Sequence, residues 1–314
     1  MQTAFTDLVG CSHPLQQAVM GGVAVPELAA AVARAGALGM LCEFDARPPA
    51  ERIRRTLSRA GGGSVGMGFF GQWMNDDLET FERAAAELRV VEVFWTEPDA
   101  SLVDRCRASG PALFAWQVGS AKSAVAAQDA GCDFVVVQGV EAGGHVRGTT
   151  ARDDLLEAVL AQVSVPVVVA GGIAGAADVR RAIDAGAAAV RVGTAFVATE
   201  ESGANGAYID ALLAAGSGDE TVLTTAFGEG WPDAPHRVLR SALAAAEALD
   251  LDVVGEAGGA GARYPLPRFS VTPPTRDVTG HIEAMALYAG TGVGDVNHLR
   301  SAVDLVAELV SGLG

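Results

Sequence analysis

The sequence has little positive charge and no cysteine pattern. Its 314 residues include 22 basic against 38 acidic ones, a formal charge of -16, and no long basic cluster. Nucleic acid and anionic membranes are therefore not expected partners. The cysteines Cys11, Cys42, Cys106 and Cys132 form no C-x-x-C pair, and no histidines or cysteines fall at ligand spacing. This excludes common zinc and dithiol centres and predicts free thiols in a reducing compartment.

Long apolar runs are also missing. No uninterrupted run reaches the roughly 18 residues that span a bilayer, and residues 1–7 lack a basic segment followed by an apolar one. We therefore expect a cytoplasmic protein with no membrane span. Half of the residues are hydrophobic, which suffices for a large core, and barrels of about 250 residues form single domains.

Short apolar runs alternate with segments of helical spacing over the first two thirds of the chain. The strands are expected at residues 14–19, 38–44, 65–70, 90–95, 112–118, 134–137, 165–170 and 188–192, with helices such as 26–36 and 77–88 between them. Strand, helix and strand within about 30 residues must run parallel and right-handed. Eight such units favour an α/β fold of the (β/α)8 TIM-barrel type over an open doubly wound sheet.

The alternation breaks between residues 208 and 279, a region rich in glycine and proline with a helical run at 238–249. We predict a small cap subdomain here, inserted after strand eight and lying over the barrel mouth. Residues 1–207 and 280–314 would then form the barrel, and 208–279 the cap. Helical patterns resume at 277–288 and at 296–313, and the last of them is expected to close the barrel. The runs at 238–249 and 296–313 are rich in alanine and leucine, which leaves a homodimer open.

Glycine and polar residues gather where six of the eight strands end. These strand ends are Met20-Gly21-Gly22, Gly68 to Gly71, Gln117, Gln138 to His145, Gly171-Gly172 and Gly193-Thr194. Barrel enzymes place their chemistry at the carboxyl ends of the strands. His145, which follows the paired glycines Gly143 and Gly144, is a candidate acid or base, because imidazole exchanges protons near neutral pH. A histidine that only caps a turn is the alternative, and His236 is a second possible mouth residue.

Two of these glycine-rich turns follow adjacent strands, seven and eight, where barrel enzymes commonly bind phosphate. The Thr194 hydroxyl adds a donor. A ligand with a phosphate tail and a flat head, such as flavin mononucleotide (FMN), suits this arrangement. Gly21, Gly22 and Gly143 would leave room for the ring, and the amides of Gln138 or Gln117 would bond its polar edge. The residues alone leave a phosphorylated sugar or indole open.

Over nearly the whole chain these residues resemble the nitronate monooxygenase family, formerly called 2-nitropropane dioxygenases. The resemblance is carried by Gln17-Ala-Val-Met20-Gly21-Gly22, Gln138-Gly-Val-Glu-Ala-Gly-Gly-His145, the 167–173 strand end, Val192-Gly-Thr-Ala-Phe196 and Leu287-Tyr-Ala-Gly290. It implies a TIM barrel that holds FMN non-covalently and oxidises small-molecule alkyl nitronates with O2 to a carbonyl compound and nitrite.

The resemblance also implies roles for single residues. Gln138 and Gly143 would lie near the flavin ring, with Met20, Gly21 and Gly22 beneath it. Gly172, Arg191, Val192, Gly193 and Thr194 would surround the phosphate and ribitol, and His145 would be the catalytic base or a nitronate contact. As further cofactor contacts at the same strand ends we expect Gly68, Gln117, Gly144 and Gly171.

Three strand ends depart from the family pattern. Gly68 stands where members often carry asparagine, Trp95 where a Phe-Gly pair is usual, and Gln117 where some members are basic. Two alternative functions remain. One is an FMN- and NAD(P)H-dependent enoyl reductase, although those enzymes usually carry Glu at position 138 and Ser at position 142. The other is a flavin barrel acting on a dedicated biosynthetic intermediate.

Overall fold

A computed structural model describes residues 1–44, 48–74, 78–259 and 262–313. Eight parallel strands form one sheet in the order β1-β9-β8-β6-β5-β4-β3-β2. They are β1 Leu15–Gln17, β2 Gly39–Cys42, β3 Val65–Phe70, β4 Val90–Phe94, β5 Leu113–Val118, β6 Phe134–Gln138, β8 Val167–Ala170 and β9 Ala189–Val192. The sheet closes on itself because Gln16 of β1 pairs with Leu38, the residue before β2. The predicted TIM barrel is therefore confirmed.

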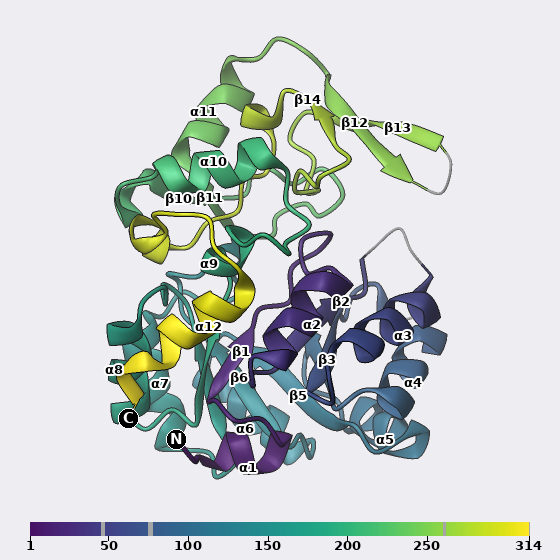
Figure 1. Ribbon diagram of the computed structural model, residues 1–314, viewed down its shortest axis with the longest axis vertical. Helices are drawn as coiled ribbons and strands as arrows, with labels where there is room; N and C mark the ends of the chain where they lie inside the picture. The colour runs from purple at the N-terminus through teal and green to yellow at the C-terminus, as the bar shows by residue number, and fades with distance from the viewer. Residues whose placement is uncertain (45–47, 75–77, 260–261, 314) are drawn as a thin grey trace.

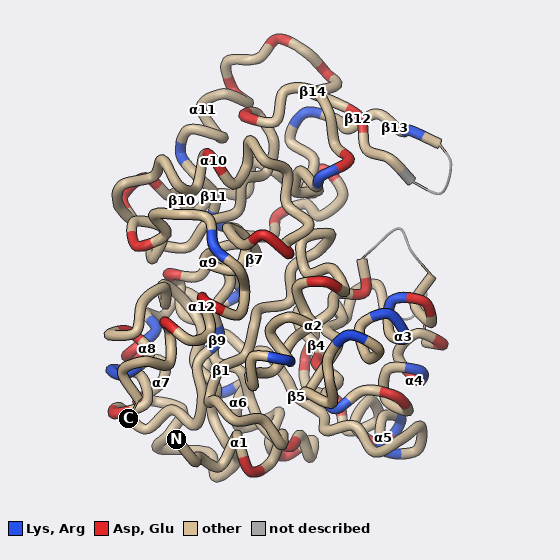
Figure 2. The backbone as a smooth tube through the Cα atoms, in the orientation of Figure 1, with Lys and Arg blue, Asp and Glu red and all other residues tan. Residues whose placement is uncertain are grey.

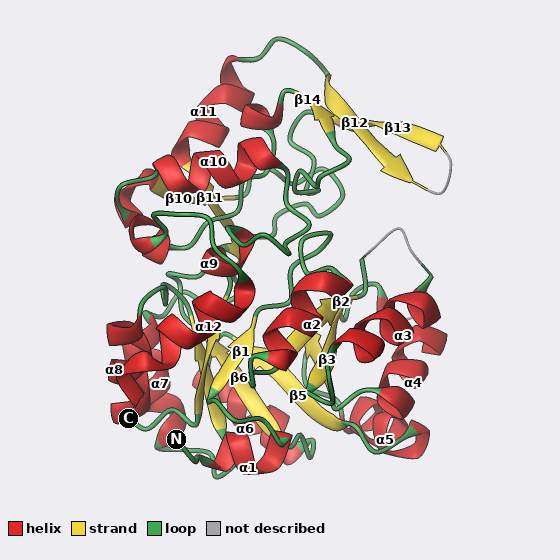
Figure 3. Cartoon of the chain, viewed as in Figure 1, coloured by secondary structure: helices red, strands yellow, loops and turns green. Residues whose placement is uncertain are grey.

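Helices surround the strands, as Figure 3 shows. They are α1 Ala4–Val9, α2 Pro26–Arg34, α3 Pro49–Arg59, α4 Leu78–Glu87, α5 Ala100–Ser109, α6 Ala121–Asp129, α7 Arg152–Leu160, α8 Ala176–Asp184 and α12 Ala302–Val310. The helix expected at 296–313 begins only at Ala302, because the Ser301 hydroxyl caps it by accepting a hydrogen bond from the Asp304 N–H. Helix α12 contacts α2 and α8 and so completes the ring of helices. The start expected at Asp77 and the chain end at Gly314 lie outside the described residues.

The barrel interior is apolar at one end and polar at the other. At the amino end of the strands, Phe5 of α1 packs edge-on against Phe134, with ring centroids 5.5 Å apart, so α1 closes this end. Towards the carboxyl end, five polar side chains are buried inside the barrel: Gln16, Glu92, Gln117, Gln138 and Arg191. Buried polar groups require partners, so this layer is where a polar ligand is expected to bind.

Between β9 and α12 the chain leaves the barrel and builds a cap. In Figure 1 the cap lies over the end of the barrel opposite both termini. Its elements are α9 Thr194–Val197, α10 Gly206–Ala214, η2 Gly218–Glu220, β10 Thr221–Thr224, β11 His236–Leu239, α11 Arg240–Ala248, β12 Val253–Gly259, β13 Ala262–Pro267, β14 Thr279–Gly280, η3 Ile282–Ala284 and η4 Thr291–Asp295, while η5 Ser311–Leu313 ends the described chain.

The cap has its own apolar core, formed by α10, β12, β13 and the segment 282–293. The run at 238–249 is one of the two that leave a homodimer open. Its helix α11 packs against η3 of the same chain, and the homodimer stays a prediction. The division into residues 1–207 with 280–314 and residues 208–279 also stays a prediction.

The helix expected at 277–288 is wrong. Residues 279–280 instead form β14, which pairs with β12, and a 3-10 turn follows. Gly280 explains the difference, because it has a φ of +118° and a Cβ there would lie 2.4 Å from the Val254 carbonyl oxygen. Only glycine accepts this backbone and this close approach, and an isolated sequence pattern does not reveal either.

The loop that carries His145 is fixed by the cap. Gly144–His145 form the short strand β7, which pairs antiparallel with β11 so that His145 faces His236 and Gly144 faces Arg237. The Val146 N–H donates to the Pro235 carbonyl at 2.8 Å and extends the pairing. The sequence predicted a loop here, since two residues are too few to show alternation. The pairing holds the backbone of the candidate base by hydrogen bonds to the cap.

Charged residues of both signs lie on the outer helices. Figure 2 shows both signs mixed along α3, α4 and α5, where ion pairs such as Arg105–Glu82 form. Among the helices of the described residues, none has the length and apolar character needed to cross a membrane. The four cysteines are free thiols, as expected, and burial raises the pKa of Cys106 and Cys132 to about 12.

Candidate active site

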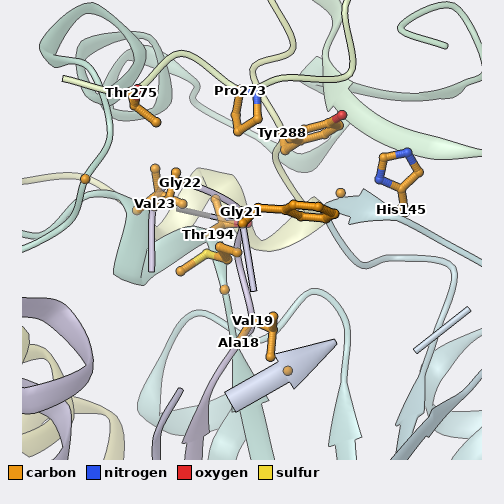
Figure 4. A pocket seen from close by; sticks show the side chains of 18 of the residues that line it. Ala18, Val19, Gly21, Gly22, Val23, His145, Thr194, Pro273, Thr275 and Tyr288 are labelled. Atoms are coloured by element: carbon orange, nitrogen blue, oxygen red, sulfur yellow. The ribbon is translucent and has the colours of Figure 1, made fainter. Parts of the chain in front are cut away.

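A cavity of about 1060 Å³ opens at the carboxyl ends of the strands, beneath the cap. The predicted ligand residues that line it are Met20, Gly21, Gly22, Gly68, Gln117, Gln138, Gly143, Gly144, His145, Gly171, Gly172, Arg191, Gly193 and Thr194. In Figure 4, His145 lies on one side, Gly22 and Val23 lie on the other, and Pro273 and Thr275 of the cap lie above. The structure therefore brings thirteen of the fourteen predicted cofactor residues, together with His145, around one space.

Val192 is the exception. Its side chain is fully buried in the layer between barrel and helices, and its carbonyl oxygen accepts a hydrogen bond from the Ala18 N–H at 2.8 Å. Because side chains alternate along a strand, Val192 points away when Arg191 points inward. The expectation of a ligand contact from Val192 is not supported by this placement.

The glycines expected to leave room for a flat ring serve different purposes. A Cβ at Gly143 would lie 2.5 Å from the Gly290 backbone nitrogen, and one at Gly22 would lie 2.6 Å from the Thr275 methyl. These two glycines therefore make room for other parts of the chain. At Gly21 the nearest atom to an added Cβ belongs to Phe44, at 3.9 Å. Of the three, only Gly21 could carry a Cβ without a clash, in ordinary contact with Phe44.

The turns after β8 and β9 form a glycine-lined cradle. Gly171 and Gly172 both have positive φ, and a Cβ at Gly172 would lie 2.7 Å from the Thr291 hydroxyl oxygen. The Thr194 hydroxyl accepts a hydrogen bond from the Gly290 N–H at 3.0 Å, so its own proton is free to be donated. The segment around Gly290 is thus a third wall of the cradle, beside the two turns that the sequence singled out.

His145 is held from its backbone, and its ring is enclosed. The Gln138 amide nitrogen donates to the His145 carbonyl at 3.0 Å, which joins the end of β6 to β7. The Nε2 atom of His145 is buried and has no hydrogen-bond partner in the described part of the chain. Burial, and to a smaller extent the neighbouring His236, lowers the pKa of His145 from 6.5 to about 3. At neutral pH the imidazole is therefore neutral and able to accept a proton.

The pKa of His145 leads to a prediction for the pH profile. Protonation removes a base, and a pKa near 3 keeps His145 unprotonated well below its ordinary value. For a reaction in which His145 is the base, we expect kcat/KM to stay flat as the pH falls from 7 to 5, with the acidic decline only below that range. The measurement is kcat/KM against pH at constant ionic strength. A decline centred at 6.5 would show that the base is not enclosed as described.

A buried ion pair lies at the bottom of the cavity. Arg191 of β9 reaches across the barrel to the Glu92 carboxylate of β4. It also donates a hydrogen bond to the side-chain amide oxygen of Gln117. Gln16 donates to the same carboxylate at 3.0 Å. The resemblance places Arg191 around phosphate and ribitol, but its guanidinium is committed to Glu92 and Gln117 inside the barrel. The positive charge of Arg191 therefore lies at the bottom of the cavity, below the glycine-lined turns.

The polar atoms left over suit a flavin. Gln138 Oε1 and Arg191 Nε are buried without a partner among the described residues. Gln117 also lines the cavity, and its contact with Arg191 uses the side-chain oxygen and not the amide nitrogen. The polar edge of a flavin ring offers both donors and acceptors, and buried polar atoms need such partners. Together with the glycine-lined cradle, these atoms fit FMN.

His236 is not a mouth residue. It is fully buried, its Nε2 accepts a hydrogen bond from the Phe227 N–H at 3.2 Å, and its Nδ1 lies 2.9 Å from the Ala234 carbonyl oxygen. The Nδ1 atom therefore carries the proton. Both ring nitrogens are satisfied, so His236 supports the strand that pairs with His145 and has no atom left for a ligand.

The departures at strands three and four have structural reasons. A Cβ at Gly68 would lie 2.3 Å from a Val19 methyl, so a side chain at this position requires a different residue at 19. Trp95 has a positive φ of 64°, which is rare for a bulky residue, and its ring centroid lies 5.9 Å from that of His145. Trp95 thus belongs to the surroundings of the candidate base.

Two site residues were missed by sequence reasoning. Glu92 is a lone carboxylate in an otherwise apolar strand, Val90–Phe94, and that isolation was a usable signal. Trp231 of the cap stacks on the His145 ring, with centroids 3.9 Å apart and an interplanar angle of 18°. No pattern in the sequence connects positions 145 and 231, which come together only through the pairing of β7 with β11.

Comparisons with known proteins agree with this geometry. The family model described as nitronate monooxygenase matches residues 2–55 and 76–312. A 5-hydroxy-7a-methyl-1-oxo-octahydro-1H-indene-4-carboxyl-CoA dehydrogenase of Rhodococcus jostii is 34% identical over 77% of this chain and 67% of its own length. A nitronate monooxygenase of Pseudomonas aeruginosa is 30% identical over 78% of this chain and 83% of its own.

Solved structures extend the similarity to the whole chain. A nitroalkane oxidase from Streptomyces ansochromogenes is 29% identical with a TM-score of 0.76, and the match covers 99% of this chain and 98% of the other. FabK from Thermotoga maritima has a TM-score of 0.78 at 24% identity, covering 99% and 96%. The second similarity shows the fold alone.

Proposed function

The chain belongs to the nitronate monooxygenase family, a family of flavin-dependent oxidoreductases, and from this premise we propose that it uses FMN and O2 to oxidise nitroalkanes or their nitronates to a carbonyl compound and nitrite. The observation that carries the proposal is the position of His145, whose imidazole lines the cavity with a buried Nε2 that has no hydrogen-bond partner among the described residues. A neutral imidazole held in this place has a lone pair that can accept a proton from an acidic C–H placed against it.

The base acts through its position and its dry surroundings. A nitroalkane binds with its acidic C–H towards His145 Nε2, which accepts the proton and leaves a nitronate anion beside the imidazolium. The apolar surroundings exclude water and strengthen the attraction between these two charges. Gln138 and the pairing with β11 keep the imidazole in place. For a substrate that arrives as nitronate, His145 binds and orients it without removing a proton.

Different residues of the cavity would bind different parts of the cofactor. The cradle of Gly171, Gly172, Gly193 and Thr194 would hold the phosphate, and Gln138, Gln117 and Arg191 would hold the polar edge of the ring. When bound, the flavin supplies the electron acceptor that O2 reoxidises. Arg191 and Glu92 together bring no net charge to the cavity, and the guanidinium presents its unpartnered Nε–H as a donor.

A second candidate function is oxidation next to a CoA thioester. It is supported by the 34% identity to the Rhodococcus dehydrogenase, and the same neutral base would remove a proton from the carbon beside a thioester carbonyl. This candidate corresponds to the dedicated intermediate left open by the sequence. The NAD(P)H-dependent enoyl reductase is less well supported, because FabK shares only the fold at 24% identity.

The two candidates differ in their products. Purified enzyme loaded with FMN and incubated with propyl nitronate in air is expected to release nitrite and propanal in equal amounts. The matched incubation contains acyl-CoA esters in place of the nitronate. Nitrite formation in the first incubation supports the proposal. Its absence, together with an unsaturated or oxidised CoA product in the second, would establish the alternative.

The cradle gives a separate prediction for cofactor binding. Replacing Gly193 by valine and Thr194 by leucine fills the cradle and removes the free hydroxyl, so we expect FMN affinity to fall by about 100-fold or more, the equivalent of one lost hydrogen bond to a charged group with the added steric exclusion of the phosphate. The measurement is FMN content after purification and Kd by fluorescence quenching. Gly206→Val is the control, since a Cβ at Gly206 meets nothing within 4 Å. Unchanged yellow protein from the double variant would refute the phosphate site.

A further inference from the structure

Six aromatic rings form one connected group that reaches the His145 imidazole through Trp95 and Trp231. They come from the ends of β2, β3 and β4 and from the cap, and we refer to them as the aromatic group: Phe44, Phe70, Trp73, Phe94, Trp95 and Trp231. Five of them, all except Trp95, line the cavity. Neither the cofactor cradle nor the proton transfer uses these rings. The group includes three of the four tryptophans of the chain, so a large apolar surface is concentrated at one place.

The cap residue Trp231 lies at the centre of the group. Its indole lies parallel to His145 at 3.9 Å between centroids, while Trp73 and Trp95 meet it edge to face, each at 4.8 Å. Phe70 meets it in the same way at 5.3 Å. The other rings thus form a slot with the imidazole on one side, and the slot is filled by a flat bicyclic ring of this same chain.

The position of Trp231 indicates what the slot accepts. Trp231 stacks on the imidazole that would react with the substrate, so its indole occupies space that the substrate must enter. The indole therefore shows the shape of group that this space can hold. We propose that the aromatic group is a subsite for a flat, uncharged ring joined to the acidic carbon of the substrate, and that Trp231 is the residue that yields this place. The proposal rests on His145 as the reacting base of the proposed function.

The contacts favour an uncharged ring over a cation. Aromatic cages bind cations through exposed ring faces, but the edge-to-face contacts in this group cover the faces with the edges of neighbouring rings. A positive charge is also disfavoured beside His145, whose pKa burial lowers. The carboxylate of Glu43 accepts a hydrogen bond from the Phe70 N–H at 2.6 Å and is engaged with the backbone.

The loop that carries Trp231 belongs to the cap and is held through its backbone. Trp231 is joined to Gly228 by a backbone hydrogen bond of 2.9 Å, and Glu229 exchanges backbone hydrogen bonds with Phe269 and Val271. Gly230, between them, has a φ of +97°, which glycine adopts without strain. Because these contacts use only the backbone, a substrate ring would take the place of the indole through a change of the Trp231 side-chain rotamer, with the barrel strands left in place.

The test measures binding directly. Isothermal titration calorimetry on the purified holoenzyme uses indole as the flat neutral probe, trimethylphenylammonium as a cation and 1-butanol as a linear neutral molecule. We expect Trp231→Ala to bind indole at least tenfold more tightly than the unaltered protein, with no comparable gain for the other two probes. Trp231→Leu, which leaves a smaller space and protects the fold, should show a smaller gain for indole. Trp116→Phe is the control, because Trp116 is buried away from the cavity and its Nε1 has no partner to lose.

The outcomes separate this proposal from the proposed function. If both Trp231 variants keep their circular dichroism but bind indole no better than the unaltered protein, or prefer the cation, the subsite assignment is wrong even where nitrite is produced. If indole binding tightens as expected but no nitronate yields nitrite, the proposed function fails and the subsite remains. In the unaltered enzyme, kcat/KM should be at least tenfold higher for phenylnitromethane nitronate than for ethyl nitronate, and the reverse preference would also overturn the proposal.

Discussion

His145→Ala is expected to lower kcat/KM for neutral nitroalkanes by about 100- to 10,000-fold, the range for loss of a positioned general base. In the proposed reaction the enclosed imidazole takes the proton, and its Nε2 has no other partner in the described residues. Pre-formed nitronates have already lost this proton, so their kcat/KM should fall much less. Steady-state oxygen consumption with each form of the same compound measures the difference.

Two controls keep the result on His145 specific. FMN content should be unchanged in His145→Ala, because the cradle residues and Gln138 remain in place. His281→Asn changes an exposed imidazole of the cap that does not line the cavity and should preserve the discrimination between the two substrate forms. An equal loss on nitroalkane and nitronate in His145→Ala would contradict its assignment as the base and leave only a binding role.

Glu92→Ala is expected to destabilise the folded protein by about 3–5 kcal/mol, because it leaves the Arg191 guanidinium buried without its counter-charge. Both side chains are at least 95% buried, so water does not compensate for the loss. Chemical denaturation at pH 7 measures the free energy of unfolding. Since the side-chain oxygen of Gln117 still accepts a hydrogen bond from Arg191, a fall at the lower end of the range is expected.

Two further variants define what the pair contributes. Glu97→Ala removes an exposed partner of Arg147 and should change stability by less than about 1 kcal/mol. The double change Glu92→Met with Arg191→Met removes both charges and should recover most of the lost stability, since well-packed apolar residues often replace a buried ion pair without cost. A double variant as unstable as Glu92→Ala would show that the pair acts through packing and not through charge.

The barrel was predictable from the sequence because its signal is repetitive. Eight apolar runs of strand length, each followed by helical spacing, leave few alternatives, and the carboxyl ends of parallel strands must meet at one mouth. That geometry alone brings Gly21, Gln138 and Gly193 together although they are far apart in the chain. Most of the predicted cavity residues were identified for this reason.

The errors arise where two distant segments determine the structure together. Gly143 looks like space for a ligand until the backbone at Gly290 is placed against it, and the helix expected at 277–288 is replaced by pairing with β12. Trp231 and His145 stack only because the cap strand β11 pairs with β7. Such contacts follow from tertiary pairing, which local pattern does not encode.

The most direct test of the central claim is the absorbance spectrum of the purified protein, mixed anaerobically first with propyl nitronate and then, in a separate sample, with NADPH. We expect a flavin spectrum, identified as FMN after release, that changes rapidly with the nitronate and does not change with NADPH. Rapid bleaching by NADPH without a response to the nitronate would contradict the nitronate assignment in favour of a reductase. A protein that neither contains nor binds flavin would contradict the account of the whole site.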